Sequence, residues 1–243
     1  MKELDAFEDD LVARFERHPV LAGAALLSAD GFAAVLLQRR FLSLAFTPAY
    51  DLAIDLLEDE SSRRIARVIL REEYPGGDGR VPSHREDMKA DMLRLGVSRK
   101  ALVETAPTAV TVEATTAIFR LIAEAGRGPD ADLRLVTILR FWGEILVAAE
   151  YGRLWPRMAQ ALTGDGVNRS RFYHPHLVHD AKAHPLGAES LPSATHSDQL
   201  GARLAELVTG EESAAGFRET EQRVLRIKTD FYDQFLPLVP APN

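Results

Sequence analysis

The sequence predicts an all-α protein built as one helical bundle. Apolar residues recur at three- and four-residue spacing along most of its 243 residues, and no segment shows the sustained two-residue alternation of a strand. Hydrophobic residues make up 46% of the chain, which is enough to bury a full core at this length, so we expect a single domain over residues 1–243. The clearest turn cluster, residues 126–130, is too short to separate two domains.

The expected helices follow one another with recognisable starts and stops. Ser28 and Asp30 offer N-caps for a long helix, which Pro48 is expected to kink or break. Pro82 and Ser83 are typical of a helix start, and the Gly-rich turn before them ends the preceding helix. We expect helices at residues 4–15, 28–57, 61–73, 82–95, a short one from 98, 112–125, 131–154, 170–183, 196–208 and 217–235.

Composition excludes several classes of protein. Asp and Glu total 36 against 29 Lys and Arg, a net charge of −7, so nucleic acid is not an expected partner. The absence of cysteine rules out disulfides, a thiolate nucleophile and cysteine-bound metals. No apolar run approaches the roughly 20 residues of a membrane span, and the acidic N-terminus does not resemble an export signal. We therefore expect a cytoplasmic protein without membrane contact, in which His, Asp and Glu bind any metal.

Histidine crowding is the strongest chemical signal in the sequence, because five of the seven histidines fall within residues 174–196. Residues four apart on a helix lie about 40° from each other around its axis, so His176, Asp180 and His184 would project from one face. Helical bundles bind paired metal ions with carboxylates and imidazoles at such spacings. Nitrogen and oxygen donors without thiolate suit iron or manganese. The competing interpretation is a solvated turn, because proline and glycine follow the cluster.

A bundle site also needs carboxylates from other helices. Glu73 follows Ile69 by one helical turn and so lies on or beside an apolar stripe. His84 lies just beyond the Gly-rich turn, and a tight connection would bring it towards Glu73. Glu72 is the competing choice, since it neighbours Glu73 at the end of the same helix.

The long helix at residues 131–154 offers two further carboxylates. Glu150 follows Leu146 by four residues along the apolar stripe, whereas Glu144 follows Arg140 by four, a pairing typical of a solvent-facing surface. We therefore expect Glu150 to be the inward carboxylate, with Glu144 as the alternative.

Several stretches resemble the haem-oxygenase-like di-iron oxidases, often labelled iron-containing redox enzymes. Residues 72–84 resemble the family's Glu-Tyr-Gly-rich turn and His, and residues 92–97 its Leu-Gly segment. Residues 172–176 with Asp180 resemble its aromatic pair, His, and Asp four residues on. Residues 15–21 are similar to the start of the wider superfamily, which includes thiaminase II and pyrroloquinoline quinone synthase. The resemblance covers most of the chain and implies a haem-oxygenase-like bundle of seven to eight helices.

The resemblance implies two Fe(II) ions per chain, bound by three histidines and at least three carboxylates. The positions that match its ligands are Glu73, His84, Glu150, His176 and Asp180. The last ligand departs from the family's His-x-x-x-Asp-x-x-His pattern, because Ala183 stands three residues after Asp180. His184 lies four residues after Asp180, one position beyond the family's final ligand. His196 precedes a sequence similar to the one that follows that ligand in the family. Both histidines stay candidates.

The resemblance also implies a function: a non-haem di-iron oxidase of specialised metabolism that uses dioxygen to oxidise a small amine, an amino-acid-like molecule or a fatty acid. A substrate carboxylate could be bound by Arg140, Arg153, Arg171 or Lys182, and the spacing of these residues does not favour any one of them. One alternative is a cofactor-independent acid–base oxidase or cyclase resembling pyrroloquinoline quinone synthase, and another is a non-enzymatic helical binding protein. Thiaminase activity is not expected, since that family's nucleophile is a cysteine. Homodimers are common in the superfamily, although no segment of this sequence marks an interface.

Overall fold

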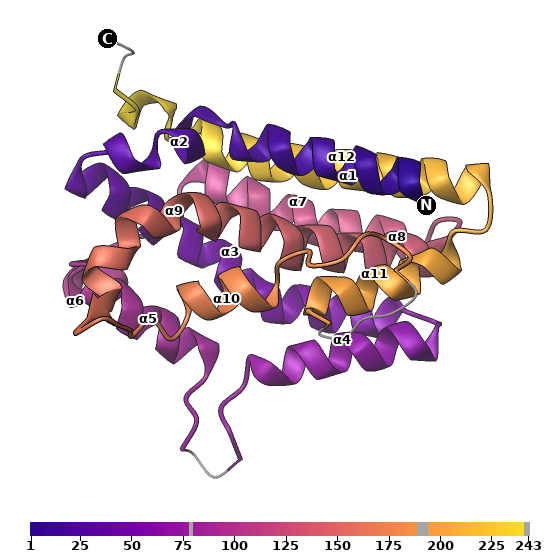
Figure 1. Ribbon diagram of the computed structural model, residues 1–243, viewed down its shortest axis with the longest axis horizontal. Coiled ribbons are helices and arrows are strands. Elements are labelled where there is room, and N and C mark those ends of the chain that lie inside the picture. Colours follow the sequence, from indigo (N-terminus) through magenta and orange to yellow (C-terminus); the bar gives the residue numbers. More distant parts are fainter. Residues whose placement is uncertain (78–79, 189–193, 241–243) are drawn as a thin grey trace.

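Long helices running side by side make up the protein, whose computed structural model describes residues 1–77, 80–188 and 194–240 (Figure 1). The predicted all-α class is confirmed, and a two-residue antiparallel pair, β1 with β2, is a minor addition. The elements in chain order are α1 (Lys2–Glu16), α2 (Pro19–Ala22), η1 (Ala24–Leu26), α3 (Ala29–Leu56), α4 (Glu60–Glu72), α5 (His84–Arg94), α6 (Arg99–Glu104), α7 (Ala109–Ala125), α8 (Ala131–Ile138), η2 (Leu139–Ile145), α9 (Leu146–Leu162), β1 (Thr163–Gly164), β2 (Val167–Asn168), α10 (Tyr173–His179), α11 (His196–Leu207), α12 (Glu211–Asp233) and η3 (Leu236–Leu238).

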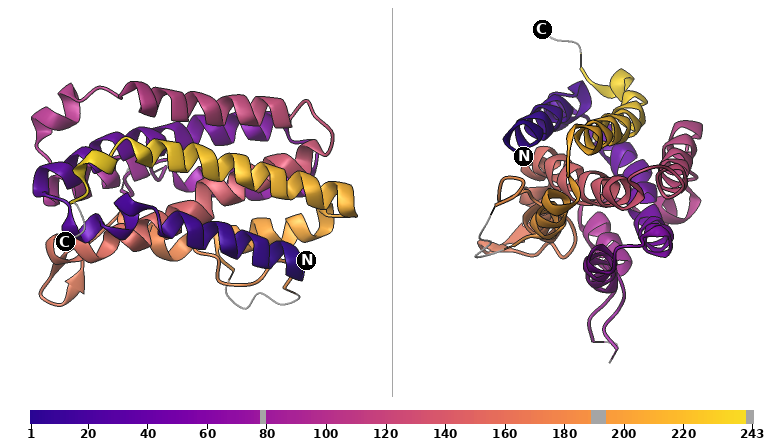
Figure 2. Two further views of the ribbon diagram at one scale, coloured as in Figure 1. Left: turned by 90° about the horizontal axis from the view of Figure 1, so that it is seen from above. Right: turned by 90° about the vertical axis from the view of Figure 1, so that its right-hand side faces the viewer.

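One continuous helical rod, formed by α8, η2 and α9, occupies the centre of the bundle. The end-on view in Figure 2 shows the other long helices arranged around it. α8 packs against α12, α11 and α7, while α9 packs against α10 and α1. All seven residues of η2 are buried, including the charged Arg140 and Glu144. Residues 135–148 in the middle of the rod are all buried, so this stretch has no solvent-facing stripe, whereas the second half of α9 exposes Arg153, Pro156 and Gln160.

Side-chain caps fix several helix starts near the positions that the sequence predicts. The Ser28 hydroxyl accepts a hydrogen bond from the Gly31 amide at the start of α3. Ser83 and Glu86 form a reciprocal capping box at the start of α5. Such caps satisfy amide groups that have no acceptor within the helix, and each stabilises a protein by about 1 kcal/mol.

The observed helices differ from the predicted ones at several places; α12, for example, begins at Glu211 and not at residue 217. α3 continues past Pro48 to Leu56, so this proline does not break the helix. The central rod extends to Leu162 with Pro156 inside it, eight residues beyond the expected end. The helix expected at residues 170–183 is shorter, because α10 ends at His179 and Asp180 is its C-cap.

The buried apolar side chains form one continuous cluster that runs the length of the bundle. Edge-on contact of the Phe15 and Tyr232 rings, with centroids 5.8 Å apart, joins α1 to α12 within it. Among the described residues, no helix is both long enough and apolar enough to cross a membrane.

Candidate metal centre

Three ligand-type side chains meet where α4 ends, α5 begins and α10 passes by. Glu73 is the C-cap of α4, His84 is the first residue of α5, and His176 lies on α10. Glu73 Oε1 lies 2.7 Å from His84 Nδ1 and 3.9 Å from His176 Nε2. The structure thus brings these three candidate ligands together, and we refer to them as the first group.

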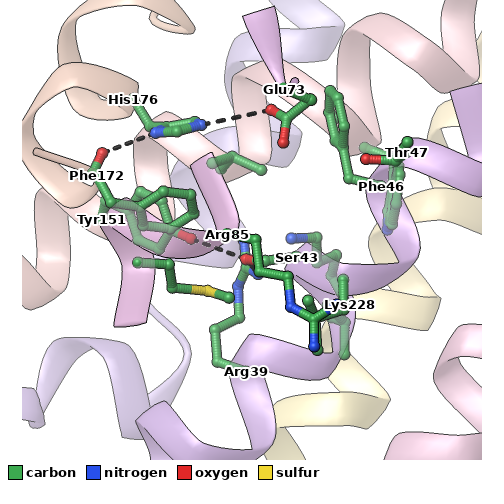
Figure 3. A pocket seen from close by; sticks show the side chains of 16 residues that line it. Arg39, Ser43, Phe46, Thr47, Glu73, Arg85, Tyr151, Phe172, His176 and Lys228 are labelled. Carbon is green, nitrogen blue, oxygen red and sulfur yellow. Dashed lines mark hydrogen bonds and ion pairs between the residues drawn. The ribbon is translucent and has the colours of Figure 1, made fainter. Parts of the chain in front are cut away.

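Hydrogen bonding fixes the orientation of His176 in this group. Its Nδ1–H donates to the Phe172 carbonyl oxygen over 2.7 Å, which leaves Nε2 directed towards Glu73 (Figure 3). An imidazole held through one nitrogen in this way presents the other to a metal ion. Burial by itself lowers the pKa of His176, but the nearby Asp180 and Glu73 carboxylates outweigh it and raise that pKa to about 9. Burial raises the pKa of Glu73, and the two histidines reverse this effect and lower it to about 2.

A second group of three side chains comes from the central rod, the end of α10 and the start of α11. Glu144 lies in η2, Asp180 is the C-cap of α10, and His196 is the first residue of α11. His196 Nδ1 lies 3.4 Å from Glu144 Oε2 and 3.7 Å from Asp180 Oδ1. Thr195, the N-cap of α11, forms a capping box with Asp198 that fixes where this helix begins.

Charge in the second group is concentrated and buried. Glu144 and Asp180 are only 1% and 3% exposed. Burial and the neighbouring Glu144 charge raise the pKa of Asp180 to about 7. Burial opposes protonation of His196, yet the Asp180 and Glu144 carboxylates raise its pKa to about 11. Two buried carboxylates side by side are costly unless a cation lies between them, so the arrangement suits a metal ion.

Both groups face the same cavity, which has a volume of about 140 Å³. Its charged and imidazole lining comprises Glu72, Glu73, His84, Glu144, His176, His179, Asp180 and His196. In each group, one ligand atom from every residue lies within 4.8 Å of the others. Three imidazoles and three carboxylates, without sulfur, form a donor set that fits two iron or manganese ions.

A π-helical segment brings Glu144 into this position. η2, Leu139–Ile145, is wound more widely than the α-helices on either side of it, and such segments are common at functional sites. Within η2, Gly143 leaves space for α3 to approach: a Cβ there would lie 3.0 Å from the Tyr50 ring and 3.1 Å from Phe46. Tyr50 uses this space to donate a short hydrogen bond from its hydroxyl to Glu144.

The expectation that Glu150 is the inward ligand on the central rod is corrected. Glu150 is fully buried, but its carboxylate belongs to a different cluster: Arg39 Nε lies 2.7 Å away, Lys228 Nζ lies 3.1 Å away, and the Tyr232 hydroxyl donates to it. Arg140 and Glu144 do not form the solvent-facing pair that their spacing predicts, because each is only 1% exposed.

Among the two histidines considered for the last position, the structure brings His196 to the cavity and not His184. Because α10 ends at His179, the chain has left the helix before residue 184, and His184 no longer shares a face with His176. His184 Nδ1 lies instead 2.8 Å from Asp198 Oδ2, away from both groups. The segment 189–193 between the two histidines lies outside the described residues.

Glu72, the alternative to Glu73, also reaches the cavity. Its Oε2 lies 3.3 Å from His196 Nε2, on the side of the ring opposite Glu144. The Glu72 side chain is 50% exposed, whereas Glu73 is 15% exposed and contacts two histidines. Both adjacent carboxylates therefore face the site, one from each side of the α4 C-terminus.

A third cluster of carboxylates, Asp5, Glu8 and Asp9 on α1, has a different explanation. Lys182 Nζ lies 2.7, 3.0 and 2.5 Å from these three residues, and Arg140 forms a short ion pair with Glu8. These cations already compensate the carboxylates, so nothing there calls for a metal ion. The same contacts show that Arg140 and Lys182, two candidates for binding a substrate carboxylate, are engaged elsewhere.

Solved structures of other proteins resemble this fold closely, although no family model matches the chain and no curated protein matches it. A TenA family transcription regulator from a Silicibacter species aligns with a TM-score of 0.59 and 16% identity, over 98% of this chain and 96% of that one. A CADD-like protein of unknown function from Nostoc punctiforme aligns with a TM-score of 0.67 and 13% identity, over 99% of this chain and 100% of that one. A second crystal structure of that protein gives 0.64 over 97% and 95%. These similarities establish the haem-oxygenase-like fold; at such identities they establish the fold alone.

Proposed function

We propose that this protein is a non-haem di-iron oxidase that uses dioxygen to oxidise a small organic molecule. The observation that carries the proposal is that two groups, each with carboxylate and imidazole ligands, line one buried cavity. The sequence resemblance to haem-oxygenase-like di-iron oxidases supports the same assignment, since it implies three histidines and at least three carboxylates.

The two groups divide the ligands between two ions. One ion would be held by Glu73, His84 and His176, and the other by Glu144, Asp180 and His196. Bound as ferrous ions, the metals would supply electrons to dioxygen. Glu72 is close enough to the second group to add a further carboxylate, because it lies 3.3 Å from His196.

Side chains around the ligands would hold them in place and keep water out. The Phe172 carbonyl fixes the His176 ring, and the Tyr50 hydroxyl fixes one oxygen of Glu144. Such supporting contacts set ligand orientation and basicity. Phe46 stacks on Tyr50 with ring centroids 4.2 Å apart and lines the cavity, so α3 contributes an aromatic wall to the site.

Anaerobic titration of the metal-free protein with Fe(II) tests the proposal. We expect two irons per chain, followed by a transient visible absorption band on rapid mixing with dioxygen. His176→Ala and Asp180→Ala should each lose at least one iron and the band. His184→Ala is the matched control and should retain both, because His184 lies outside the two groups.

Iron binding no stronger in the wild type than in the ligand variants would contradict the proposal. The paired histidines and carboxylates would then be assigned to acid–base chemistry on an organic substrate, for which the 2.7 Å contact between Glu73 and His84 is suitable.

A further inference from the structure

A second cavity adjoins the candidate metal centre and has the dimensions of a substrate site. Its volume is about 260 Å³, and it shares Phe46, Glu73 and His176 with the metal cavity. In Figure 3, Glu73 and His176 lie at one end of this cavity and Arg39 at the other. A molecule that fills it would therefore touch the first ligand group with one end.

Positive charge is in excess at the end far from the ligands. Arg39 and Lys228 line the cavity and are buried, and Glu150 is the carboxylate that both of them contact. Two cations and one carboxylate leave one uncompensated positive charge inside the protein. Burial and the neighbouring Arg39 charge lower the pKa of Lys228 to about 8 despite the attraction of Glu150.

Hydrogen-bond donors are also left over at this end. A lysine ammonium has three N–H donors, and among the described residues Glu150 is the acceptor that Lys228 contacts. Arg39 has five donors, and its contacts are the Glu150 carboxylate and the Ser43 hydroxyl, 2.7 Å from Nη1. Buried donors are normally satisfied, so a ligand with several acceptor oxygens would complete them.

The walls between the two ends are mainly apolar. Leu42, Met88, Trp142, Val147 and Phe172 contribute apolar side chains, and the hydroxyl groups there belong to Ser43, Thr47 and Tyr151. Glu150 is occupied by its own cations, so Glu73 is the one lining carboxylate within the described residues that could receive an ammonium group, and Glu73 belongs to the ligand group. The lining thus favours an apolar acid over an amino acid.

We propose that the Arg39–Lys228 end binds the carboxylate of an apolar monocarboxylic acid whose other end reaches Glu73 and His176. The volume corresponds to about nine waters, which suits an acid of about ten non-hydrogen atoms. This inference rests on the proposed oxidase function and narrows its substrate class. Arg85, which is exposed and also lines the cavity, marks the side from which an anion would enter.

Calorimetric titration with octanoate tests the inference, using the neutral octanamide as the matched ligand. We expect octanoate to bind at least about tenfold more tightly than octanamide, in both the metal-free and the anaerobic Fe(II)-loaded protein. Lys228→Met should abolish that preference while keeping the fold, because it leaves Arg39 and Glu150 as a neutral pair. Lys100→Met, at an exposed site, is the control and should change nothing.

Two results would overturn the inference. Equal affinity for the acid and the amide in the wild type would show that no anion site exists there. Octanoate binding that requires iron and is insensitive to Lys228→Met would place the carboxylate on the metal instead. Iron stoichiometry, measured on the same samples, reports separately on the oxidase proposal.

Discussion

Glu144 and Glu150 lie six residues apart on the central rod, and the structure gives them opposite roles. Glutamine at either position keeps the side-chain volume and removes the charge. Glu150→Gln removes the one carboxylate that compensates Arg39 and Lys228. Glu144→Gln removes one of two carboxylates that stand side by side in the second ligand group.

The expected costs differ in size. Removing one partner of a buried ion pair typically costs about 3–5 kcal/mol, so Glu150→Gln should lower the melting temperature of a chain of this length by about 10 °C. For Glu144, ligand atoms within 4.8 Å imply a repulsion from Asp180 of at least about 3.5 kcal/mol at an effective dielectric constant of 20. His196, 3.4 Å from Glu144, contributes an attraction of about 5 kcal/mol on the same scale. These effects largely cancel, so metal-free Glu144→Gln should stay within about 1.5 kcal/mol of wild type.

Denaturant unfolding of the metal-free proteins measures the change in stability, and Fe(II) titration measures the number of irons bound. Glu150→Gln should be strongly destabilised yet still bind two irons once folded. Glu144→Gln should be much closer to wild type in stability and bind one iron. Loss of an iron in Glu150→Gln with unchanged stability would contradict this assignment. It would show that Glu150 binds iron and that its contacts with Arg39 and Lys228 do not stabilise the fold.

Three further predictions follow from the same geometry. His196→Ala should lose one iron whereas His184→Ala should lose none, as measured by metal analysis after gel filtration. Gly143→Ala should cost about 1–3 kcal/mol by denaturant unfolding and weaken iron binding, because the new Cβ displaces Tyr50 from Glu144; full retention of iron affinity would show that the Tyr50 contact is not needed. Since the pKa of His196 is raised to about 11, its contribution to stability is present below pH 6.5 and lost as pH rises towards 11. The metal-free protein should therefore melt at a lower temperature at pH 9.5 than at pH 6.5, while Mn(II) affinity rises over the same range.

Local sequence signals predicted much of the fold and five of the six residues of the two ligand groups, with His196 as one of two alternatives. Hydrophobic periodicity and capping residues located most of the helices, including the start of α5 at His84 beside its Ser83 cap. Glu73 and His84 could be paired because a short Gly-rich connection joins their helices. His176 and Asp180 could be paired because they are one helical turn apart.

The wrong predictions concern side chains whose positions depend on contacts between residues far apart in the sequence. Because residues 135–148 of the central rod are buried on every side, the apolar stripe does not identify a single inward face there. The π-helical segment also shifts the helical phase between Leu139 and Leu146. The buried pairing of Arg140 with Glu8, 132 residues away, left no local trace. Because α10 ends at His179, His184 does not share a helical face with His176. The sequence has no typical C-capping residue that would predict this helix end.

Anomalous diffraction at the iron absorption edge, from crystals loaded with Fe(II) without oxygen, shows directly whether two irons bind in this cavity. We expect two anomalous peaks per chain, one among Glu73, His84 and His176 and the other within contact of Asp180 and His196. A single peak, or a peak among the α1 carboxylates instead, would contradict it.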